Sequence, residues 1–253
     1  MSEYNMQILI CGGTGCKASE SEEIRNTFND LINVYGLEDE VQVVMTGCFG
    51  FCEKGPIVKM MPDKTFYVHV KPSDADEIIK EHVVKGRQVE RLLYKDPATS
   101  KPISDSQHME FYKKQIRIAL RNCGFIDPEN IEEYIARDGY QALGKCLAEM
   151  TPAQVIDEIK KSGLRGRGGG GFPTGLKWEI TAKVPGDIKY VVCNADEGDP
   201  GAFMDRSILE GDPHSVIEAM TINGYCTGAN NGLVYIRAEY PLAITRLKIA
   251  IEQ

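Results

Sequence analysis

Four of the eight cysteines fall in two short motifs near the N-terminus, CGGTGC and CFGFC, and these four are Cys11, Cys16, Cys48 and Cys52. The apolar run 6–10 leads into the first motif and the β-branched run 41–45 precedes the second, so each motif is predicted to follow a strand. Two loops at the same edge of one sheet can bring four thiolates around one metal centre. The other cysteines are scattered singly, and we interpret them as small buried apolar side chains or incidental thiols: Cys123, Cys146, Cys193 and Cys226.

The residue types in the two motifs leave more than one kind of metal centre open. Structural zinc is mostly bound by cysteine pairs two to four residues apart, so the spacing permits a zinc site with four thiolate ligands. A thioredoxin-type dithiol would need the pattern Cys-x-x-Cys, which neither motif contains. The glycines of the motifs let backbone N–H groups approach the sulfurs of an iron–sulfur cluster, where such bonds tune the reduction potential. Zinc and a [2Fe-2S] cluster therefore both stay open from the residues alone, with unligated buried thiols as a third alternative.

The elements predicted around these motifs have the order strand, helix, strand, hairpin and helix, over 6–10, 19–35, 41–45, 57–70 and 73–84. This order is typical of a small thioredoxin-like α/β domain, which we expect to span 1–85. The polar stretch 86–108 contains Pro97 and Pro102 and is predicted to be a linker.

The cysteine spacing on this order of elements resembles the thioredoxin-like [2Fe-2S] ferredoxins. The pattern is Cys, four residues, Cys, a long gap, Cys, three residues, Cys, and all four ligand positions match. The same module occurs in the small subunit of the NADH-dehydrogenase part of respiratory complex I. It is also fused to the flavin subunit of NADH-linked iron hydrogenases and formate dehydrogenases. The resemblance implies one [2Fe-2S] cluster with the ligands Cys11, Cys16, Cys48 and Cys52.

The remainder of the chain, 109–253, is predicted to be a second α/β domain. Helical periodicity dominates from 109 to 162, with Thr151 as a predicted helix cap and Pro152 at the first helical position. Further helices then alternate with single apolar strands. This alternation is typical of a mainly parallel sheet with helices on its faces.

A glycine-rich stretch interrupts the second domain, with Gly166, Gly168 and Gly171 at the spacing of a dinucleotide-binding fingerprint. The segment before it is helical, whereas a Rossmann fingerprint follows a strand, so the motif alone is weak and a flexible linker is the alternative. Two features argue against a linker. The first is a set of cations suited to a phosphate, Arg165, Arg167 and Lys177, and the second is an aromatic side chain beside a proline, Phe172-Pro173. We interpret the stretch as a phosphate-binding loop with a stacking aromatic side chain.

A polar loop after the predicted strand 189–193 carries further candidate cofactor-binding residues, Asn194, Asp196, Glu197 and Asp199. Ligands of parallel α/β sheets bind past the carboxyl ends of the strands, and carboxylates there can accept hydrogen bonds from ribityl or ribose hydroxyls. An ordinary turn that ends in Asp199-Pro200-Gly201 is the alternative. A metal ion is a poorer alternative, because the loop offers three carboxylates and no other evident ligand.

Together, LRGRGGGGFPTGLKW and CNADEGDPGAFMDR resemble the flavin-binding subunit of complex I and of NAD-linked hydrogenases and formate dehydrogenases. The resemblance implies FMN and NAD(H) as cofactors, with the FMN phosphate and isoalloxazine edge held by Gly166, Arg167, Gly168 and Lys177. Asn194 and Asp196 are implied to contact the flavin. Phe172 is implied to stack on the adenine of the nucleotide, and Asp199 to contact NADH. Gly198-Asp199 stands where complex I subunits usually have Ser-Glu, which is more similar to the hydrogenase branch.

The same family carries a further segment of the type GAYICGEETAL, which completes the flavin and NADH pocket, and then a ubiquitin-like domain and a [4Fe-4S] helical bundle. The 253-residue sequence contains none of these. We therefore expect it to be a fragment or one part of the larger subunit.

The net charge of −8, from 29 basic and 37 acidic residues, argues against nucleic acid or an anionic membrane as a partner. The N-terminus does not resemble a signal peptide, and no apolar run approaches the roughly 20 residues that span a bilayer, so we expect a cytoplasmic protein. The expected function is that of a flavin-dependent NADH dehydrogenase subunit. It would pass electrons between NADH, FMN and iron–sulfur clusters, with other iron–sulfur subunits of a hydrogenase, formate dehydrogenase or complex-I-like assembly as partners. No side chain is expected to be a catalytic acid or base. The alternatives are a non-catalytic iron–sulfur docking module and a zinc-binding protein.

Overall fold

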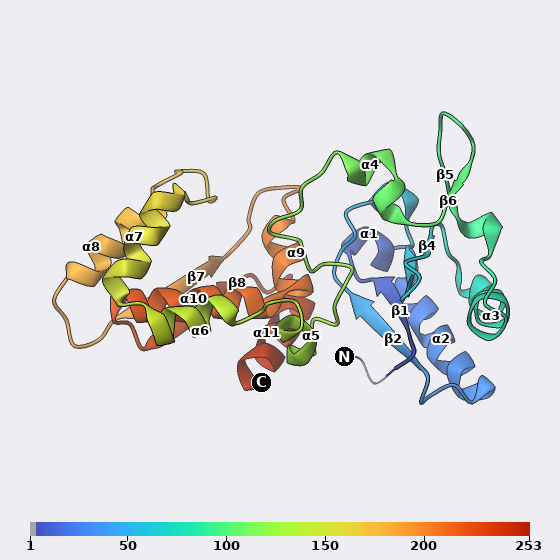
Figure 1. The fold of residues 1–253 in the computed structure, drawn as a ribbon, viewed down its shortest axis with the longest axis horizontal. Helices are drawn as coiled ribbons and strands as arrows, with labels where there is room; N and C mark the ends of the chain where they lie inside the picture. Colours follow the sequence, from blue (N-terminus) through green and yellow to red (C-terminus); the bar gives the residue numbers. More distant parts are fainter. Residues whose placement is uncertain (1–3) are drawn as a thin grey trace. The chain divides into compact units, whose positions relative to one another are not determined.

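The computed structural model describes residues 4–253, and the chain divides into two compact units, Met1–Glu133 and Tyr134–Gln253. Figure 1 shows that each unit combines strands with helices that pack on them. This agrees with the expected α/β class.

The first unit is built on a four-stranded sheet with the strand order β2-β1-β3-β4. β1 and β2 are parallel and are joined by the helix α2 (Ser21–Tyr35), because a parallel pair needs a crossover connection. Cys11 at the end of β1 therefore lies beside Thr46 at the end of β2. β3 is antiparallel to β1, and β4 is antiparallel to β3. The strands are β1 (Met6–Cys11), β2 (Val41–Thr46), β3 (Val58–Met61) and β4 (Phe66–Tyr67).

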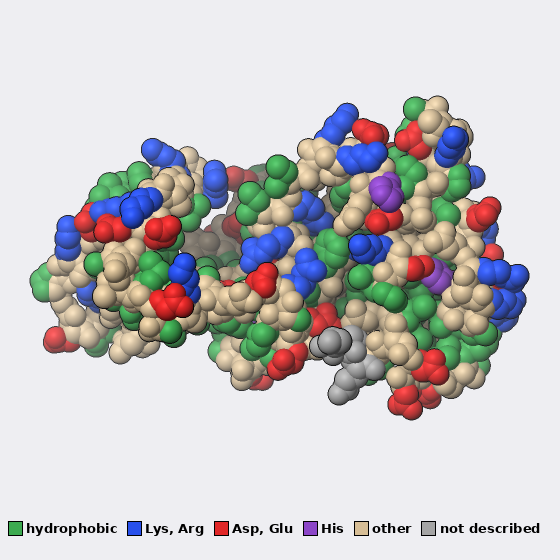
Figure 2. Space-filling model, in the orientation of Figure 1, with side chains coloured by type: hydrophobic (Ala, Val, Ile, Leu, Met, Phe, Trp, Pro, Cys, Tyr) green, Lys and Arg blue, Asp and Glu red, His purple; other side chains and the backbone are tan. Residues whose placement is uncertain are grey.

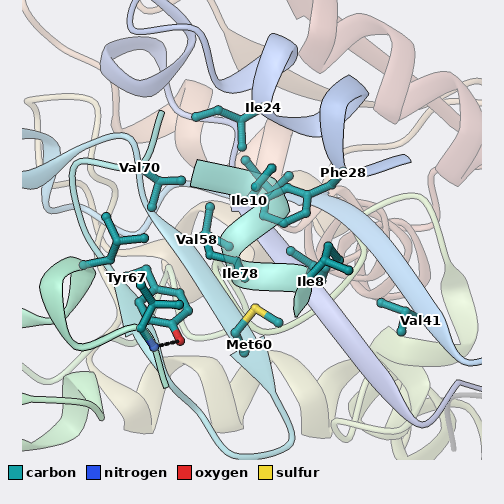
Figure 3. Close-up of a cluster of buried hydrophobic side chains, with 14 of the residues drawn as sticks. Ile8, Ile10, Ile24, Phe28, Val41, Val58, Met60, Tyr67, Val70 and Ile78 are labelled. Carbon is teal, nitrogen blue, oxygen red and sulfur yellow. Dashed lines mark hydrogen bonds between the residues drawn. The ribbon is translucent and has the colours of Figure 1, made fainter. Parts of the chain in front are cut away.

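The side chains of β1 alternate between two apolar clusters, as the two-residue period of a strand requires. Ile8 and Ile10 pack against Phe28 of α2, and Figure 3 shows these side chains together. Leu9 and Cys11 belong to the second cluster. The alternation therefore sends the Cys11 thiol away from the core beneath α2. The first unit also contains α1 (Thr14–Lys17) and α3 (Ala75–Ile78), which continues as the π-helical turn Ile79–Val84.

The stretch 86–108, expected to be a linker, packs against the sheet instead. The Val68 N–H donates to the Leu92 carbonyl at 2.9 Å, and the Phe66 N–H donates to the Ser104 carbonyl at 2.7 Å. An edge strand such as β4 leaves backbone groups without partners, and this stretch supplies them. Its elements are the 3₁₀ turns Glu90–Leu92 and Ser106–His108 and the short paired strands β5 (Tyr94–Lys95) and β6 (Pro102–Ile103).

The beginning of the expected second domain also belongs to the first unit. α4 (Glu110–Lys113) is a single turn, and 114–130 is irregular where helical periodicity was expected. Gly124 has a left-handed φ of 83°, which a helix does not accommodate. The hydroxyl of Thr46 donates to a carbonyl of this segment at 2.7 Å, in place of a helical hydrogen bond. The division between the two compact units falls between Glu133 and Tyr134.

The second unit contains the parallel strands β7 (Tyr190–Ala195) and β8 (Asn231–Ile236). The helix α10 contacts both strands and the helices α6, α7, α8, α9 and α11. The expected cap of α7 is confirmed: the Thr151 hydroxyl accepts from the Gln154 N–H at 3.4 Å. The helices are α5 (Ile131–Ile135), which runs across the division, α6 (Gln141–Glu149), α7 (Pro152–Ser162), α8 (Thr174–Lys183), α9 (Met204–Gly211), α10 (Pro213–Thr227) and α11 (Pro241–Glu252).

None of the helices within residues 4–253 has both the length and the apolar character needed to cross a membrane.

Candidate metal centre and phosphate-binding loop

The four cysteines of the N-terminal motifs meet at one edge of the first sheet. Cys11 ends β1 and Cys16 lies in α1, and both are buried. Cys48 is half-buried in the loop after β2, and Cys52 begins the 3₁₀ turn Cys52–Lys54 with its thiol exposed. The parallel pairing of β1 with β2 explains the meeting, because it places both strand ends at the same edge.

The four thiols lie close enough to shift one another's pKa: Cys11 interacts with Cys16 and Cys48, and Cys48 with Cys52. Within residues 4–253, no three His, Cys, Asp or Glu side chains surround one point in the way that ligands surround a single metal ion. A [2Fe-2S] cluster does not need such an arrangement, because it distributes its four thiolates over two irons.

The thiols influence one another's ionisation strongly. The hydrogen bond to Cys16, together with burial, raises the pKa of Cys11 to about 12. The hydrogen bond to Cys11 and burial raise the pKa of Cys48 further, whereas the bond accepted from Cys11 lowers the pKa of Cys16. Thiolates are the form that binds metal, and four of them repel one another unless a metal centre supplies positive charge. Binding of a metal centre at the four cysteines should therefore release protons from the thiols.

Glycines bring the backbone directly onto the sulfurs. A Cβ added at Gly13 would lie 2.8 Å from the Sγ of Cys48, and one added at Gly55 would lie 2.7 Å from the Sγ of Cys16. The Gly50 N–H donates to the Sγ of Cys48 at 3.3 Å. The backbone N–H of Phe49 also lowers the pKa of the Cys11 thiol, and the backbone N–H of Ile57 lowers the pKa of the Cys16 thiol. Four thiols with backbone donors in a glycine-lined cradle fit the ligand set of a [2Fe-2S] cluster.

The glycine-rich stretch forms a closed loop between α7 and α8. The Thr174 N–H donates to the Leu164 carbonyl at 2.9 Å, and the Gly166 N–H donates to the Phe172 carbonyl at 3.0 Å. The Arg165 guanidinium donates to the carbonyl of Gly171, also at 2.9 Å. The stretch is therefore an ordered loop with an exposed glycine tip, in contrast to the linker alternative.

Two of the candidate residues of this loop share one shallow depression. Phe172, with half of its surface exposed, and Lys177 line it together with Ile180 and Thr181 of α8. Gly166, Gly168 and Arg167 lie on the exposed part of the loop. The structure thus brings a cation and an aromatic ring together at one depression beside the exposed glycine backbone of the loop. That combination suits a phosphate and a flat ring.

In the loop after β7, Glu197 has a clear structural role. Its carboxylate accepts from the backbone N–H groups of Asp205 and Arg206 at 3.0 and 3.2 Å, and from the Tyr240 hydroxyl at 3.1 Å. The Arg237 guanidinium donates to its carbonyl oxygen. Glu197 therefore binds the start of α9, a role that the polar composition of the loop did not distinguish from cofactor binding.

The other candidates in this loop lie at the surface. The Asp196 N–H donates to the side-chain oxygen of Asn194 at 3.1 Å, which is the turn chemistry noted from the sequence. Asn194, Asp196 and Asp199 are all exposed. Among the described residues, no hydrogen bond or ion pair joins the loop 164–174 to the loop 194–199.

Two groups near these sites were not singled out from the sequence. The first is the segment 109–126, whose Tyr112 and Arg117 bond to the backbone of the second cysteine motif. The second is the ring of Tyr240, which has the guanidinium groups of Arg206 and Arg237 each 5.2 Å from its centroid. The only sequence signals were the cation-rich stretch after residue 110 and the YIRAEY segment.

Comparison with known families matches both parts of the chain. Residues 3–83 match the family described as thioredoxin-like [2Fe-2S] ferredoxin, and residues 159–253 match the Nuo51 FMN-binding domain. Both matches confirm the resemblance and the fold class predicted from the cysteine and glycine motifs.

Among the relatives is the NADP-reducing hydrogenase subunit HndC of Solidesulfovibrio fructosivorans, which is 69% identical over 140 residues, 55% of this chain and 28% of that protein. The NAD-reducing hydrogenase HoxS subunit alpha of Cupriavidus necator is 34% identical over 244 residues, 92% of this chain and 37% of that protein. The chain therefore spans about a third of the length of these relatives. A thioredoxin-like [2Fe-2S] ferredoxin structure from Aquifex aeolicus is 31% identical, with 38% of this chain and 100% of that chain covered and a TM-score of 0.34.

Proposed function

Because the chain joins a thioredoxin-like [2Fe-2S] ferredoxin domain to a Nuo51 FMN-binding domain, we propose that it belongs to an electron-transfer subunit that links NAD(H) to iron–sulfur clusters. The observation that carries the proposal is the cradle in which four thiols meet glycine backbone, with the Sγ of Cys48 only 2.8 Å from a Cβ built at Gly13. FMN, when bound, supplies the exchange between two-electron hydride chemistry and single electrons.

The residues of the chain would bind and orient the cofactors. Cys11, Cys16, Cys48 and Cys52 would ligate the cluster. The loop N–H groups with Arg167 and Lys177 would hold the flavin phosphate, and Phe172 would stack on the nucleotide. Asn194 lies at the end of β7 and Asp196 and Asp199 follow the strand; all three are exposed at the place where hydroxyl-bearing ligands of parallel sheets bind. No acid or base is proposed, because hydride transfer needs positioning above all.

The proposal extends to the partners and the location. The relatives named above are hydrogenase subunits, which supports a hydrogenase-type assembly with other iron–sulfur subunits as partners. Within residues 4–253 no cysteine is paired in a disulfide, which suits a reducing compartment, and we place the protein in the cytoplasm. One relative is named as NADP-reducing and another as NAD-reducing, so NADH and NADPH should be compared directly.

The test measures flavin content and nucleotide affinity on single variants of the purified native protein. Lys177→Ala should lower the retained FMN severalfold while the Michaelis constant for NADH changes little, because charge-assisted bonds to phosphate are about twice as strong as neutral ones. Phe172→Ala should raise the Michaelis constant for NADH and keep the flavin, since stacking contributes about 1–3 kcal/mol. Lys183→Ala is the matched control on the same helix, where the lysine pairs with Glu179 at 3.0 Å.

Flavin lost from Phe172→Ala and kept in Lys177→Ala would show that the loop binds the other ligand. A colourless purified protein that contains zinc would contradict the proposed function as a whole, because zinc has no visible absorption.

A further inference from the structure

We propose that the segment 109–126 is a cap on the cluster site, and that Arg117 within it is a positioning residue that raises the reduction potential of the cluster. The inference rests on the proposed cluster at the four cysteines. Neither family match includes the segment, which lies between residues 83 and 159.

Aromatic contacts join the start of the segment to the second cysteine motif. The ring of Phe111 stacks on that of Phe51 with centroids 4.5 Å apart and an interplanar angle of 14°. The Tyr112 hydroxyl donates to the carbonyl of Phe49 at 2.9 Å. Burial raises the pKa of Tyr112, and the nearby Arg117 guanidinium partly offsets that rise.

The end of the segment is held at the start of the same motif. The Gly124 N–H donates to the Thr46 hydroxyl at 3.2 Å, and this fully buried hydroxyl donates to the Ile126 carbonyl at 2.7 Å. A Cβ at Gly124 would lie 2.5 Å from the ring of Phe49. The segment is thus packed on the motif at both of its ends, and this contact explains why glycine stands at 124.

Arg117 lies between these two anchors. Its guanidinium donates to the carbonyl of the cluster ligand Cys48 at 3.2 Å and to the carbonyl of Cys123 at 3.4 Å. It therefore ties the cap to the ligand loop and holds a positive charge beside it. In Figure 2, Lys and Arg side chains lie at the surface over α4, where the cap begins.

A cation beside the cluster favours its reduced form, because reduction adds one negative charge. Reduction potentials of iron–sulfur clusters depend on net charge, hydrogen bonding and solvent exposure. The cap acts on all three, since it carries a cation, fixes the loop that donates the Gly50 N–H to Cys48, and covers the loop with aromatic rings.

The decisive experiment is a redox titration of the full chain with anaerobically loaded cluster, followed by electron paramagnetic resonance, together with iron and sulfide analysis. Arg117→Gln should keep the cluster and favour its oxidised form by about threefold to tenfold, where tenfold corresponds to a potential 59 mV more negative. Arg117→Lys keeps a cation and should retain most of the wild-type potential. Arg121→Gln is the matched control, because Arg121 is exposed and its guanidinium donates to the carbonyl of Ile118 at 3.5 Å, away from the cysteine motif.

An unchanged potential in a fully loaded Arg117→Gln chain would overturn the inference and leave the proposed function intact. If Arg117→Gln does not load, Arg117→Lys decides: a loaded cluster with a potential near wild type supports the role of the charge, and failure of both variants to load would overturn it. Absence of any cluster from the wild-type chain would instead contradict the proposed function.

Discussion

Replacing Gly13 by alanine adds one methyl group directly against a proposed cluster ligand. The backbone of Gly13 has φ −65° and ψ 154°, which alanine adopts without strain. The nearest obstacle is the Cys48 side chain, whose Sγ and Cβ would lie 2.8 and 3.1 Å from the new carbon, whereas the Sγ of Cys11 at 3.5 Å is an ordinary contact. The substitution therefore tests how much space there is around the sulfurs without straining the backbone.

The magnitude of this change follows from the distances. Ordinary contact begins at 3.4 Å, so the Cys48 sulfur must move by about 0.6 Å. Metal–ligand distances tolerate only about 0.2 Å. We therefore expect Gly13→Ala to lose most of its cluster or to bind it with a shifted paramagnetic signal. Overpacking costs about 1–3 kcal/mol of the free energy of unfolding, partly offset by about 0.4–1 kcal/mol because alanine restricts the unfolded chain.

The assay is iron and acid-labile sulfide content with electron paramagnetic resonance, next to urea unfolding of the metal-free chain. Gly144→Ala is the control, because Gly144 is an exposed helical glycine of α6 with no atom within 4 Å of the added carbon. It should gain about 0.5–1 kcal/mol and leave the signal unchanged. A Gly13→Ala chain with full cluster content and the wild-type signal would refute the reasoning.

Three further predictions concern packing and ionisation. Gly124 has a left-handed φ of 83°, and a Cβ there would lie 2.5 Å from the ring of Phe49. Gly124→Ala should therefore lower the free energy of unfolding by about 2–5 kcal/mol, measured by urea titration. A loss below about 1 kcal/mol would contradict the packing of the cap. Tyr134→Phe removes the 2.6 Å hydrogen bond to the buried Glu218 carboxylate and should cost about 1.5–3 kcal/mol by the same measurement, whereas a neutral effect would mean that the bond contributes nothing. Burial lowers the pKa of His214, so the unfolded chain binds the imidazole proton more tightly than the folded chain does. The contribution of neutral His214 to the free energy of unfolding is therefore complete above about pH 6.5 and should fall as the pH decreases below that value. Between about pH 7.5 and 5.5 the wild-type chain should lose more stability than the His214→Phe variant does.

The cluster ligands could be predicted from the sequence because the features that position them are local. The apolar run 6–10 and the β-branched run 41–45 identify strands, and each cysteine motif comes at or just after the end of its strand. Parallel pairing of the two strands then brings the ends together, which the order strand, helix, strand already suggests. The helix cap at Thr151 is local in the same way.

The cap could not be predicted because it depends on contacts that are distant in the sequence. Tyr112 lies 63 residues from its acceptor Phe49, and Arg117 lies 69 residues from Cys48. The helical periodicity after residue 109 is overridden by these bonds. Glu197 shows a related limit, since a carboxylate that binds the start of a helix has the same sequence signature as one that binds a cofactor.

The central claim is that the four thiols hold one [2Fe-2S] cluster, and the most direct measurement is the paramagnetic signal of the reduced chain in single cysteine-to-serine variants. A Cβ added at Gly13 of the first motif would lie 2.8 Å from the Sγ of Cys48, so Cys48 of the second motif lies against the first and is the most informative position. Cys48→Ser should lose or strongly shift the signal, with less iron and sulfide bound. Cys226→Ser, which removes a buried thiol of the second unit, should leave the signal intact. An unchanged signal in Cys48→Ser would contradict the account.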